Sequence, residues 1–542
     1  MKTFHNPILK GFYPDPSICR VKDDYYLVTS SFSYFPGIPV FHSKDLVHWE
    51  QLGHVISRPG QLDYAQSAHS EGLFAPTIRY FNGIFYVVCT MVSNGREGNR
   101  ENFICTASDP AGPWSDPVII QGALGIDPSL YFAQDGTPWL CGSRIPEKRL
   151  YFTHREIYLC SLDSHTFQIA GQTKIIWDGA QTRGHWVEAP HIYRIGEWYY
   201  LIIAEGGTYQ NHCVMMARSK SIDGDYEFCP RNPVITHRHL ALNHSISVVG
   251  HGDLVETRQN QWYLVLLGIR PYGNGDYNLG RETFLAPIVW EKDQWPRIDD
   301  CAGLVQETMA APDLPAAETA APPTRDDFDK PELCLIWNQI RANRTDFYKL
   351  QNGCLRLFLS EESIDTPYAT PSFIARRLQD HQFQAAACMS FQPKGDGLEA
   401  GLCMLQNHNF YYLFTVVRKQ GKCYLQLKSH RLEGKLVNHD HYGEDAKRVE
   451  KILKVLPLPD VLDKLVLSVA CDGNHYRFSY GFHEEPLNPF VHQADMTLLS
   501  SQQAGGFVGA YLGMYASANG QKSDGFVDFD WFEYEGNTDN EF

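Results

Sequence analysis

A phrase that recurs five times within the first 300 residues constrains the fold more than any other feature of the chain. Each copy starts with a small or acidic residue, often followed by Pro, continues as a short apolar segment, turns, and ends in an aromatic-rich apolar segment. The copies begin at Asp15, Ala75, Asp127, Glu188 and His251. Their spacing is roughly 50–65 residues, which is enough for one four-stranded sheet with its loops.

Five such copies predict a five-bladed β-propeller over residues 1–308. Turn-forming pairs such as Asn82-Gly83 and Asp135-Gly136 separate the two apolar segments of a copy, as expected for adjacent antiparallel strands. A TIM barrel is disfavoured, because no amphipathic helix of about 10–12 residues separates the apolar segments.

The rest of the chain predicts a second all-β domain. Residues 309–325 are rich in Ala and Pro, which is typical of a linker. From 326 to 542 the apolar segments are short and alternating, and turn signals such as Asn352-Gly353 separate them. That pattern predicts a β-sandwich, jelly-roll-like at this length. Two domains also agree with a chain of 542 residues, since single cores stop growing at about 250–300.

The charge and the cysteines narrow the classes of partner and compartment. Lys and Arg number 47 against 63 Asp and Glu, a net charge of −16, so neither nucleic acid nor a membrane surface is an expected partner. No run of about 18 apolar residues is present, and the first residues lack the apolar core of a secretory signal. Either a signal was removed or the protein stays in the cytosol. Fourteen Cys without a C-x-x-C pair predict buried thiols in a reducing compartment, so we expect the cytoplasm.

The first residue of each copy is a candidate site residue. Equivalent positions in a propeller lie at equivalent depths around the channel, so these side chains are predicted to face one mouth. Three of them are carboxylates, Asp15, Asp127 and Glu188, while Ala75 leaves room for a ligand. Converging carboxylates push their pKa values apart, which lets one site hold an acid and a base. Taken singly, Asp15 and Asp127 could be turn caps before Pro, whereas Glu188 lies in an apolar segment.

Several segments resemble the signatures of glycoside hydrolase family 43. They are YPDPS (13–17), GIDPSL (125–130), WVEAPHIY (186–193), AEGGT (204–208) and LGRETFLAP (279–287). The whole chain is similar to the two-domain β-xylosidases of that family. The resemblance implies an inverting, exo-acting glycoside hydrolase in which Asp15 is the general base and Glu188 the general acid. Asp127 would raise the pKa of the acid and orient it.

The resemblance also implies a set of substrate contacts. Arg281 would bind sugar hydroxyls, Phe32 would wall the sugar subsite, and Phe74 stands where many relatives have Trp. His251 would lie beneath the sugar or near a calcium, and Phe507 of the second domain is a candidate for the pocket rim. Four of these have a plainer alternative: a surface arginine for Arg281, a satisfied core histidine for His251, and core packing for Phe32 and Phe507. Phe74 keeps a stacking face that is smaller than that of Trp.

The predicted function is release of xylose from the non-reducing ends of β-1,4-xylo-oligosaccharides, with α-L-arabinofuranosides as further substrates. Two alternatives stay open: a dedicated α-L-arabinofuranosidase or arabinan-cleaving enzyme, and a carbohydrate-binding propeller without catalysis. A lectin has no need of three converging carboxylates, which favours the enzyme. No cofactor is expected to be required, although calcium near His251 is an alternative. The sequence leaves a homo-oligomer open.

Overall fold

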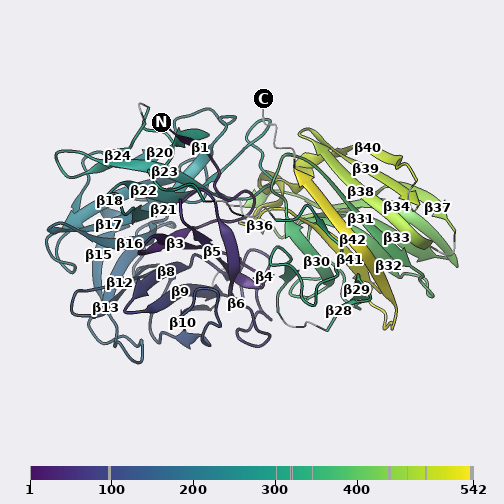
Figure 1. Cartoon of the computed structure of the whole chain (residues 1–542), viewed down its shortest axis with the longest axis horizontal. Coiled ribbons are helices and arrows are strands. Elements are labelled where there is room, and N and C mark those ends of the chain that lie inside the picture. Colours follow the sequence, from purple (N-terminus) through teal and green to yellow (C-terminus); the bar gives the residue numbers. More distant parts are fainter. Residues whose placement is uncertain are drawn as a thin grey trace. The chain divides into compact units, whose positions relative to one another are not determined.

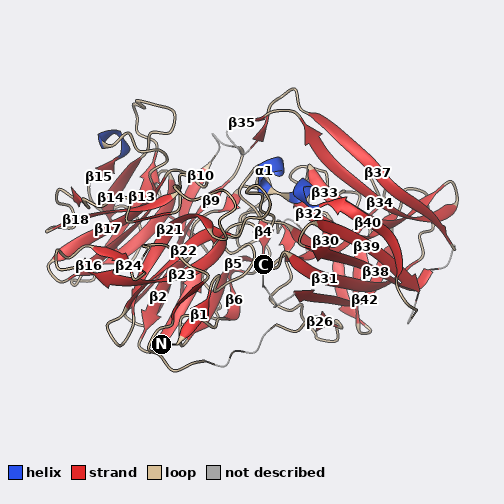
Figure 2. Cartoon of the chain, turned by 90° about the horizontal axis from the view of Figure 1, so that it is seen from above, coloured by secondary structure: helices blue, strands red, loops and turns tan. Residues whose placement is uncertain are grey.

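The computed structural model describes residues 2–95, 99–300, 302–317, 319, 322–342, 344, 346–437, 441–459, 462–482 and 485–536. It divides into two compact units. The first holds residues 1–62, 71–275 and 281–320, and the second holds residues 63–70, 276–280 and 321–542. Strands form nearly all the regular structure of both units (Figure 2). No helix in the described residues is long and apolar enough to cross a membrane.

Five antiparallel sheets form the blades of the first unit. Blade 1 holds β2 (Ser17–Val21), β3 (Asp24–Val28), β5 (Gly37–Ser43) and β6 (Glu50–Ile56). Blade 2 holds β7 (Gly72–Leu73), β8 (Thr77–Phe81), β9 (Ile84–Val92), β10 (Arg100–Ala107) and β11 (Val118–Ile119). Blade 3 holds β12 (Ile126–Phe132), β13 (Pro138–Arg144), β14 (Glu156–Ser161) and β15 (Lys174–Asp178). Blade 4 holds β16 (Glu188–Ile195), β17 (Trp198–Glu205), β18 (Cys213–Ser219), β19 (Glu227–Phe228) and β20 (Ile235–Thr236). Blade 5 holds β21 (Ser247–Glu256), β22 (Trp262–Ile269), β23 (Glu282–Trp290) and β24 (Pro296–Ile298).

The first long strand of each blade closes a ring. β2 contacts β8, β8 contacts β12, β12 contacts β16, β16 contacts β21, and β21 returns to β2. Four of these strands, β8, β12, β16 and β21, are labelled in Figure 1. β2 and β8 begin two residues after the phrase leaders Asp15 and Ala75, and β16 begins at the leader Glu188. β12 and β21 begin shortly before their leaders and contain Asp127 and His251. The predicted five-bladed propeller is therefore confirmed. Outside the blades, β1 (Thr3–His5) pairs antiparallel with β25 (Thr308–Ala310), and β4 (Tyr34–Phe35) lies between β3 and β5 in the sequence.

The core of this unit lies between neighbouring blades. Between blades 2 and 3, Val88 and Ile104 pack in one cluster with Leu130 and Leu140. A second cluster joins blades 3 and 4 in the same way. A strand that is covered on both faces has an almost continuous apolar sequence. This explains why apolar residues do not alternate with polar ones in segments such as FYVVCTM and WYLVLLG. Each such side chain contributes about 1.5–3 kcal/mol on burial, so the packed blades hold the strand ends in place.

The second unit is a sandwich of two antiparallel sheets, as predicted. One sheet runs β28-β29-β42-β31-β38-β39-β40 with β26 beside β42, and the other runs β30-β41-β32-β33-β34-β37. The bounds in the first sheet are β26 (Arg325–Asp326), β28 (Tyr348–Gln351), β29 (Cys354–Phe358), β31 (Gln382–Phe391), β38 (Leu462–Asp472), β39 (His475–Phe482), β40 (Asn488–Asp495) and β42 (Phe526–Gly536). Those in the second are β30 (Ser372–Arg377), β32 (Glu399–Asn407), β33 (Phe410–Lys419), β34 (Lys422–Glu433), β37 (Lys447–Leu458) and β41 (Tyr511–Ser517). The short elements are β27 (Gln339–Ile340), β35 (Leu436–Val437), β36 (His441–Tyr442), η2 (Met496–Leu499) and α1 (Ser501–Ala504), with η1 (Gly179–Gln181) in the first unit.

Candidate active site

The three predicted carboxylates lie at equivalent ends of three innermost strands. Asp15 comes just before β2, Asp127 is the second residue of β12, and Glu188 is the first residue of β16. Asp15 and Asp127 have left-handed backbone, with φ of 55° and 53°. Such residues are uncommon unless they are Gly, and they gather at functional sites. The β12–β13 and β16–β17 ladders also shift register beside Asp127 and Glu188, and shifts of this kind re-aim side chains.

Asp15 is buried, and two donors hold its carboxylate. Arg281 Nη1 donates to Oδ1 at 2.5 Å, and Ser30 Oγ donates to Oδ2 at 2.5 Å. Burial by itself would raise the pKa of Asp15, but the charge of Arg281 and the bond from Ser30 help to outweigh it, so the pKa is lowered. Asp15 is therefore ionised at neutral pH. Each carboxylate oxygen has two lone pairs, so Asp15 can still accept a proton donor such as water.

Asp127 and Glu188 have raised pKa values, in contrast to the lowered pKa of Asp15. Burial raises the pKa of Asp127 well above its usual range, and the charges of Glu188 and Asp15 add to that rise. Burial also raises the pKa of Glu188, where Arg155 opposes the rise and Asp15 adds to it. Asp127 Oδ2 accepts the backbone N–H of Ala189 at 3.1 Å, which fixes it beside the start of β16. Two interacting carboxyl groups titrate as a pair, and the raised pKa values mean that both favour the protonated form more than an isolated carboxyl does.

Arg155 and Trp186 support the Glu188 side of the site. Arg155 Nε lies 3.3 Å from Glu188 Oε1, and the Arg155 side chain is 9% exposed. The guanidinium also lies over the Trp186 ring, 5.1 Å from its centroid. A buried cation at this position favours the ionised form of Glu188, which is the form that remains after a proton has been donated.

The structure brings the predicted sugar contacts Arg281, Phe32 and Phe74 together. Arg281 is 4% exposed, and its guanidinium carbon lies 5.6 Å from the Phe32 ring centroid. The Phe32 and Phe74 rings are 5.1 Å apart. Phe32 is buried and has a left-handed backbone, φ 50°, whereas Phe74 is half-buried. Arg281 is thus not a surface arginine, and Phe74 is the more accessible of the two rings.

His251 adjoins the same carboxylate. Its Nδ1 lies 3.7 Å from Asp15 Oδ1, and burial lowers the pKa of His251 despite the opposing charge of Asp15. The Asp15 oxygen already accepts a bond from Arg281, whose positive charge repels a cation. The described residues include no group of three or more His, Cys, Asp or Glu side chains placed to hold a metal ion. A calcium near His251 stays a prediction.

Phe507 belongs to the second unit, where it is half-buried. Its backbone N–H donates to Ser70 Oγ at 3.1 Å, a contact within that unit. A place for Phe507 at the pocket rim stays a prediction.

Two residues of the site were missed by sequence reasoning. Ser30 had a usable signal: Ser17 pairs with Val28 in the antiparallel β2–β3 ladder, so the residues after Val28 lie opposite Asp15. No sequence signal marked Arg155, because it lies between β13 and β14 in a segment that does not repeat from blade to blade.

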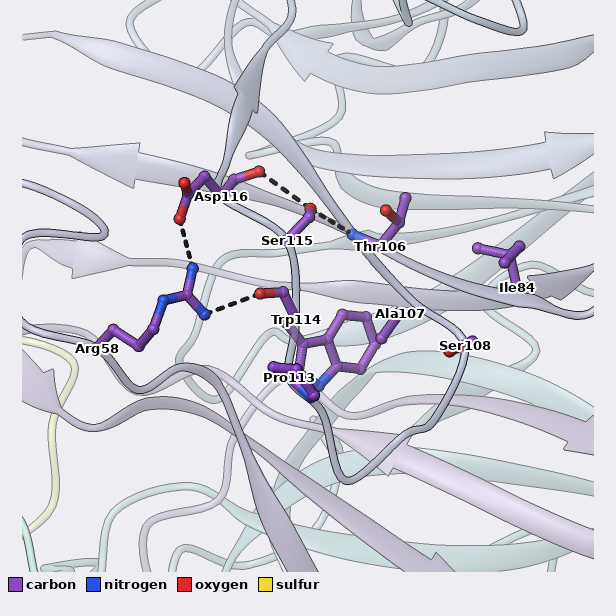
Figure 3. A pocket seen from close by; sticks show the side chains of 9 residues that line it. All are labelled: Arg58, Ile84, Thr106, Ala107, Ser108, Pro113, Trp114, Ser115 and Asp116. Atoms are coloured by element: carbon purple, nitrogen blue, oxygen red, sulfur yellow. Dashed lines mark hydrogen bonds and ion pairs between the residues drawn. The ribbon is translucent and has the colours of Figure 1, made fainter.

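A hollow of about 540 Å³ is lined by residues of blade 2 and by Arg58, which follows β6 of blade 1 (Figure 3). Its lining includes Arg58, Trp114 and Asp116, and the Arg58–Asp116 ion pair is drawn at one side. Trp114 is only 3% exposed and offers little stacking surface. None of the predicted site residues lines this hollow.

Comparisons with known proteins agree with this geometry. Residues 4–296 match the model of glycosyl hydrolases family 43, and residues 325–535 match that of the beta xylosidase C-terminal concanavalin A-like domain. A xylosidase/arabinosidase of Butyrivibrio fibrisolvens is 39% identical over 98% of this chain and 99% of its own length. The non-reducing end alpha-L-arabinofuranosidase BoGH43B of Bacteroides ovatus is 39% identical over 98% of this chain and 95% of its own.

Among solved structures, a xylan beta-1,4-xylosidase from Bacillus halodurans C-125 superposes with a TM-score of 0.89 at 32% identity, covering 98% of this chain and all of the other. The family resemblance predicted from the motifs is confirmed. With its propeller, its sandwich and its full-length relatives, the chain belongs to glycoside hydrolase family 43 and is a glycosidase of the β-xylosidase type.

Proposed function

We propose that the protein is an inverting exo-β-xylosidase that removes xylose from the non-reducing ends of β-1,4-xylo-oligosaccharides and also accepts α-L-arabinofuranosides. One observation carries the proposal: Asp15 and Glu188 lie at equivalent ends of innermost strands, and their surroundings differ. Arg281 and Ser30 both donate to Asp15, whose pKa is lowered, whereas Arg155 lies 3.3 Å from Glu188, whose pKa is raised. A base and an acid with pKa values pushed apart are what acid–base hydrolysis of a glycoside requires.

Asp15 accepts a proton from a water molecule, whose oxygen attacks the anomeric carbon of the terminal sugar. Glu188 gives its proton to the oxygen of the leaving group as the glycosidic bond breaks. Asp127 retains a proton jointly with Glu188 and keeps the acid in position, while Arg155 stabilises the Glu188 carboxylate that forms. Attack on the face opposite the leaving group inverts the anomeric configuration, so a β-xyloside gives α-xylose.

The choice of sugar rests on the relatives' names. The Butyrivibrio protein is named for both activities, and the Bacillus halodurans structure for xylan β-1,4-xylosidase alone. A dedicated α-L-arabinofuranosidase is the second candidate, because the Bacteroides ovatus relative at the same 39% identity carries that name.

Proton NMR of the anomeric signals during hydrolysis of xylobiose tests the proposal. We expect α-xylose to appear first and to mutarotate afterwards. Early β-xylose would contradict inversion. Release of arabinose from arabinofuranosides without any xylose from xylobiose would establish the second candidate.

We also propose that hydrolysis needs no added metal. The guanidinium of Arg281 already neutralises the buried Asp15 carboxylate, so no metal ion is needed to balance that charge. The same NMR assay in chelator-treated buffer should proceed at an unchanged rate. A loss that calcium alone restores would contradict this.

The proposed site of action is the cytoplasm. The thirteen cysteines of the described residues are free thiols, and eleven of them are buried. Such thiols suit a reducing compartment. Fractionation of the source cells should place the activity in the soluble cytoplasmic extract, and activity in the medium would contradict it.

A further inference from the structure

The three most exposed large hydrophobic side chains of the described residues belong to blade 3. They are Leu150, Leu124 and Phe152, exposed by 66%, 61% and 59%. In that blade Ile126 pairs with Ser143, and Arg144 with Glu156. The residues before β12 and those between β13 and β14 therefore emerge at one end of the sheet, the end that carries Asp127. Exposed apolar groups gathered at one place usually mark a binding surface.

The loop that carries Phe152 is firmly attached. The Tyr151 hydroxyl donates to the Gly184 carbonyl at 2.8 Å, and the Trp186 backbone N–H donates to the Thr153 carbonyl at 3.2 Å. These bonds tie the residues on both sides of Phe152 to the segment that leads into β16. The Phe152 ring meets the Trp186 ring edge to face, with centroids 5.7 Å apart. Phe152 is therefore held in place while its other surface faces solvent.

Two contacts connect this ring to Glu188. Trp186 comes two residues before Glu188, and Arg155 lies over its indole while its Nε is 3.3 Å from the Glu188 carboxylate. The loop with Phe152 is thus a neighbour of the proposed acid on blades 3 and 4. Asp15 and Arg281 come instead from blades 1 and 5.

We propose that Phe152, backed by Trp186, is the surface that binds the leaving group of the substrate, with Leu150 as its apolar neighbour in the same loop. The inference rests on the proposed function. A general acid sits where the bond to the leaving group breaks, so the leaving group lies on the Glu188 side. The flat apolar face of a second xylose, or an aryl ring, packs on a phenylalanine ring without any charge.

The test compares leaving groups on one sugar. Wild type, Phe152→Ala and Phe152→Tyr are assayed with methyl β-xyloside, 4-nitrophenyl β-xyloside and xylotriose. Phe152→Ala should lower kcat/KM for the nitrophenyl substrate and xylotriose by about 3- to 10-fold relative to the methyl xyloside. Phe152→Tyr should restore the wild-type ratios. The matched control is Tyr80→Ala, an exposed aromatic at the far end of β8 in the same unit, and it should leave the ratios unchanged.

Equal losses on all three substrates, or no change on any, would overturn the inference. A changed sedimentation coefficient of Phe152→Ala with unchanged ratios would assign the exposed side chains to self-association and overturn it as well. Failure of the proposed function would look different, because wild type would then cleave arabinofuranosides and no xylosides. In that case the methyl and nitrophenyl arabinofuranosides provide the same comparison of leaving groups.

Discussion

Asp15 and Glu188 each face an arginine, yet their pKa values move in opposite directions. The contacts differ in strength: Arg281 donates to Asp15 at 2.5 Å and Ser30 adds a second bond, whereas Arg155 lies 3.3 Å from Glu188. The Asp15 charge then adds to the rise in the pKa of Glu188. At the scale of single residues, the number of donors on each carboxylate separates the base from the acid.

Replacing the proposed base should stop the reaction on every substrate. Asp15→Asn keeps the shape and can still accept a bond from Arg281, but it takes no proton from water. We expect kcat/KM to fall by about 10²- to 10⁴-fold on both xylobiose and 4-nitrophenyl xyloside. Steady-state kinetics with both substrates check this. A loss confined to xylobiose would contradict the role of base.

Replacing the proposed acid should discriminate between leaving groups. Nitrophenolate leaves with little protonation, whereas the alcohol of xylobiose needs a proton. Glu188→Ala should therefore lose far more kcat/KM on xylobiose than on the nitrophenyl xyloside. Equal losses on the two substrates would exclude Glu188 as the acid.

Arg155 should set the alkaline limb of the pH profile. Activity needs Glu188 protonated, and Arg155 lowers the pKa of Glu188. Its removal in Arg155→Met raises that pKa, so the alkaline limb of kcat/KM on xylobiose should move to higher pH. The control is Arg144→Met, which removes the nearby Arg144–Glu156 pair of 2.7 Å and should leave the limb in place. An unmoved limb in Arg155→Met would contradict the assignment.

At the scale of elements, the repeated phrase was sufficient to predict the innermost strands and the carboxylates that lead them. The prediction succeeded because the blades of a propeller place equivalent residues at equivalent depths. The position of Asp15 in its copy of the phrase could therefore be matched to that of Asp127 from the sequence. The loops between strands follow no such register. Arg155 and Phe152 lie in one of them, and tertiary contacts bring that loop to Glu188: the bonds of Tyr151 and Trp186 and the approach of Arg155 to the carboxylate. These residues could not have been predicted from spacing.

At the scale of the whole propeller, one buried carboxylate joins four blades. Asp253 of β21 accepts bonds from Ser17 Oγ of β2 at 2.6 Å and from Arg79 Nη1 of β8 at 2.8 Å. The Tyr193 hydroxyl of β16 donates to its other oxygen, Oδ1. Although burial opposes it, the charge of Arg79 lowers the pKa of Asp253, so the carboxylate is ionised at neutral pH. The ring of strands is thus fastened at its centre as well as through the cores between blades.

Removing this carboxylate should destabilise the propeller strongly. Asp253→Ala leaves the Arg79 cation buried without its partner, which costs about 3–5 kcal/mol in the free energy of unfolding. Because the pKa of Asp253 is lowered on folding, the ionised group adds stability at neutral pH, and this contribution is lost as the pH falls through the acidic range. Urea unfolding of wild type and Asp253→Ala should therefore differ most at neutral pH and converge in acid. Asp23→Ala is the control, because its pair with Arg258 is exposed and contributes about 1 kcal/mol or less. Equal midpoints for Asp253→Ala and Asp23→Ala would show that the central contacts do not hold the blades together.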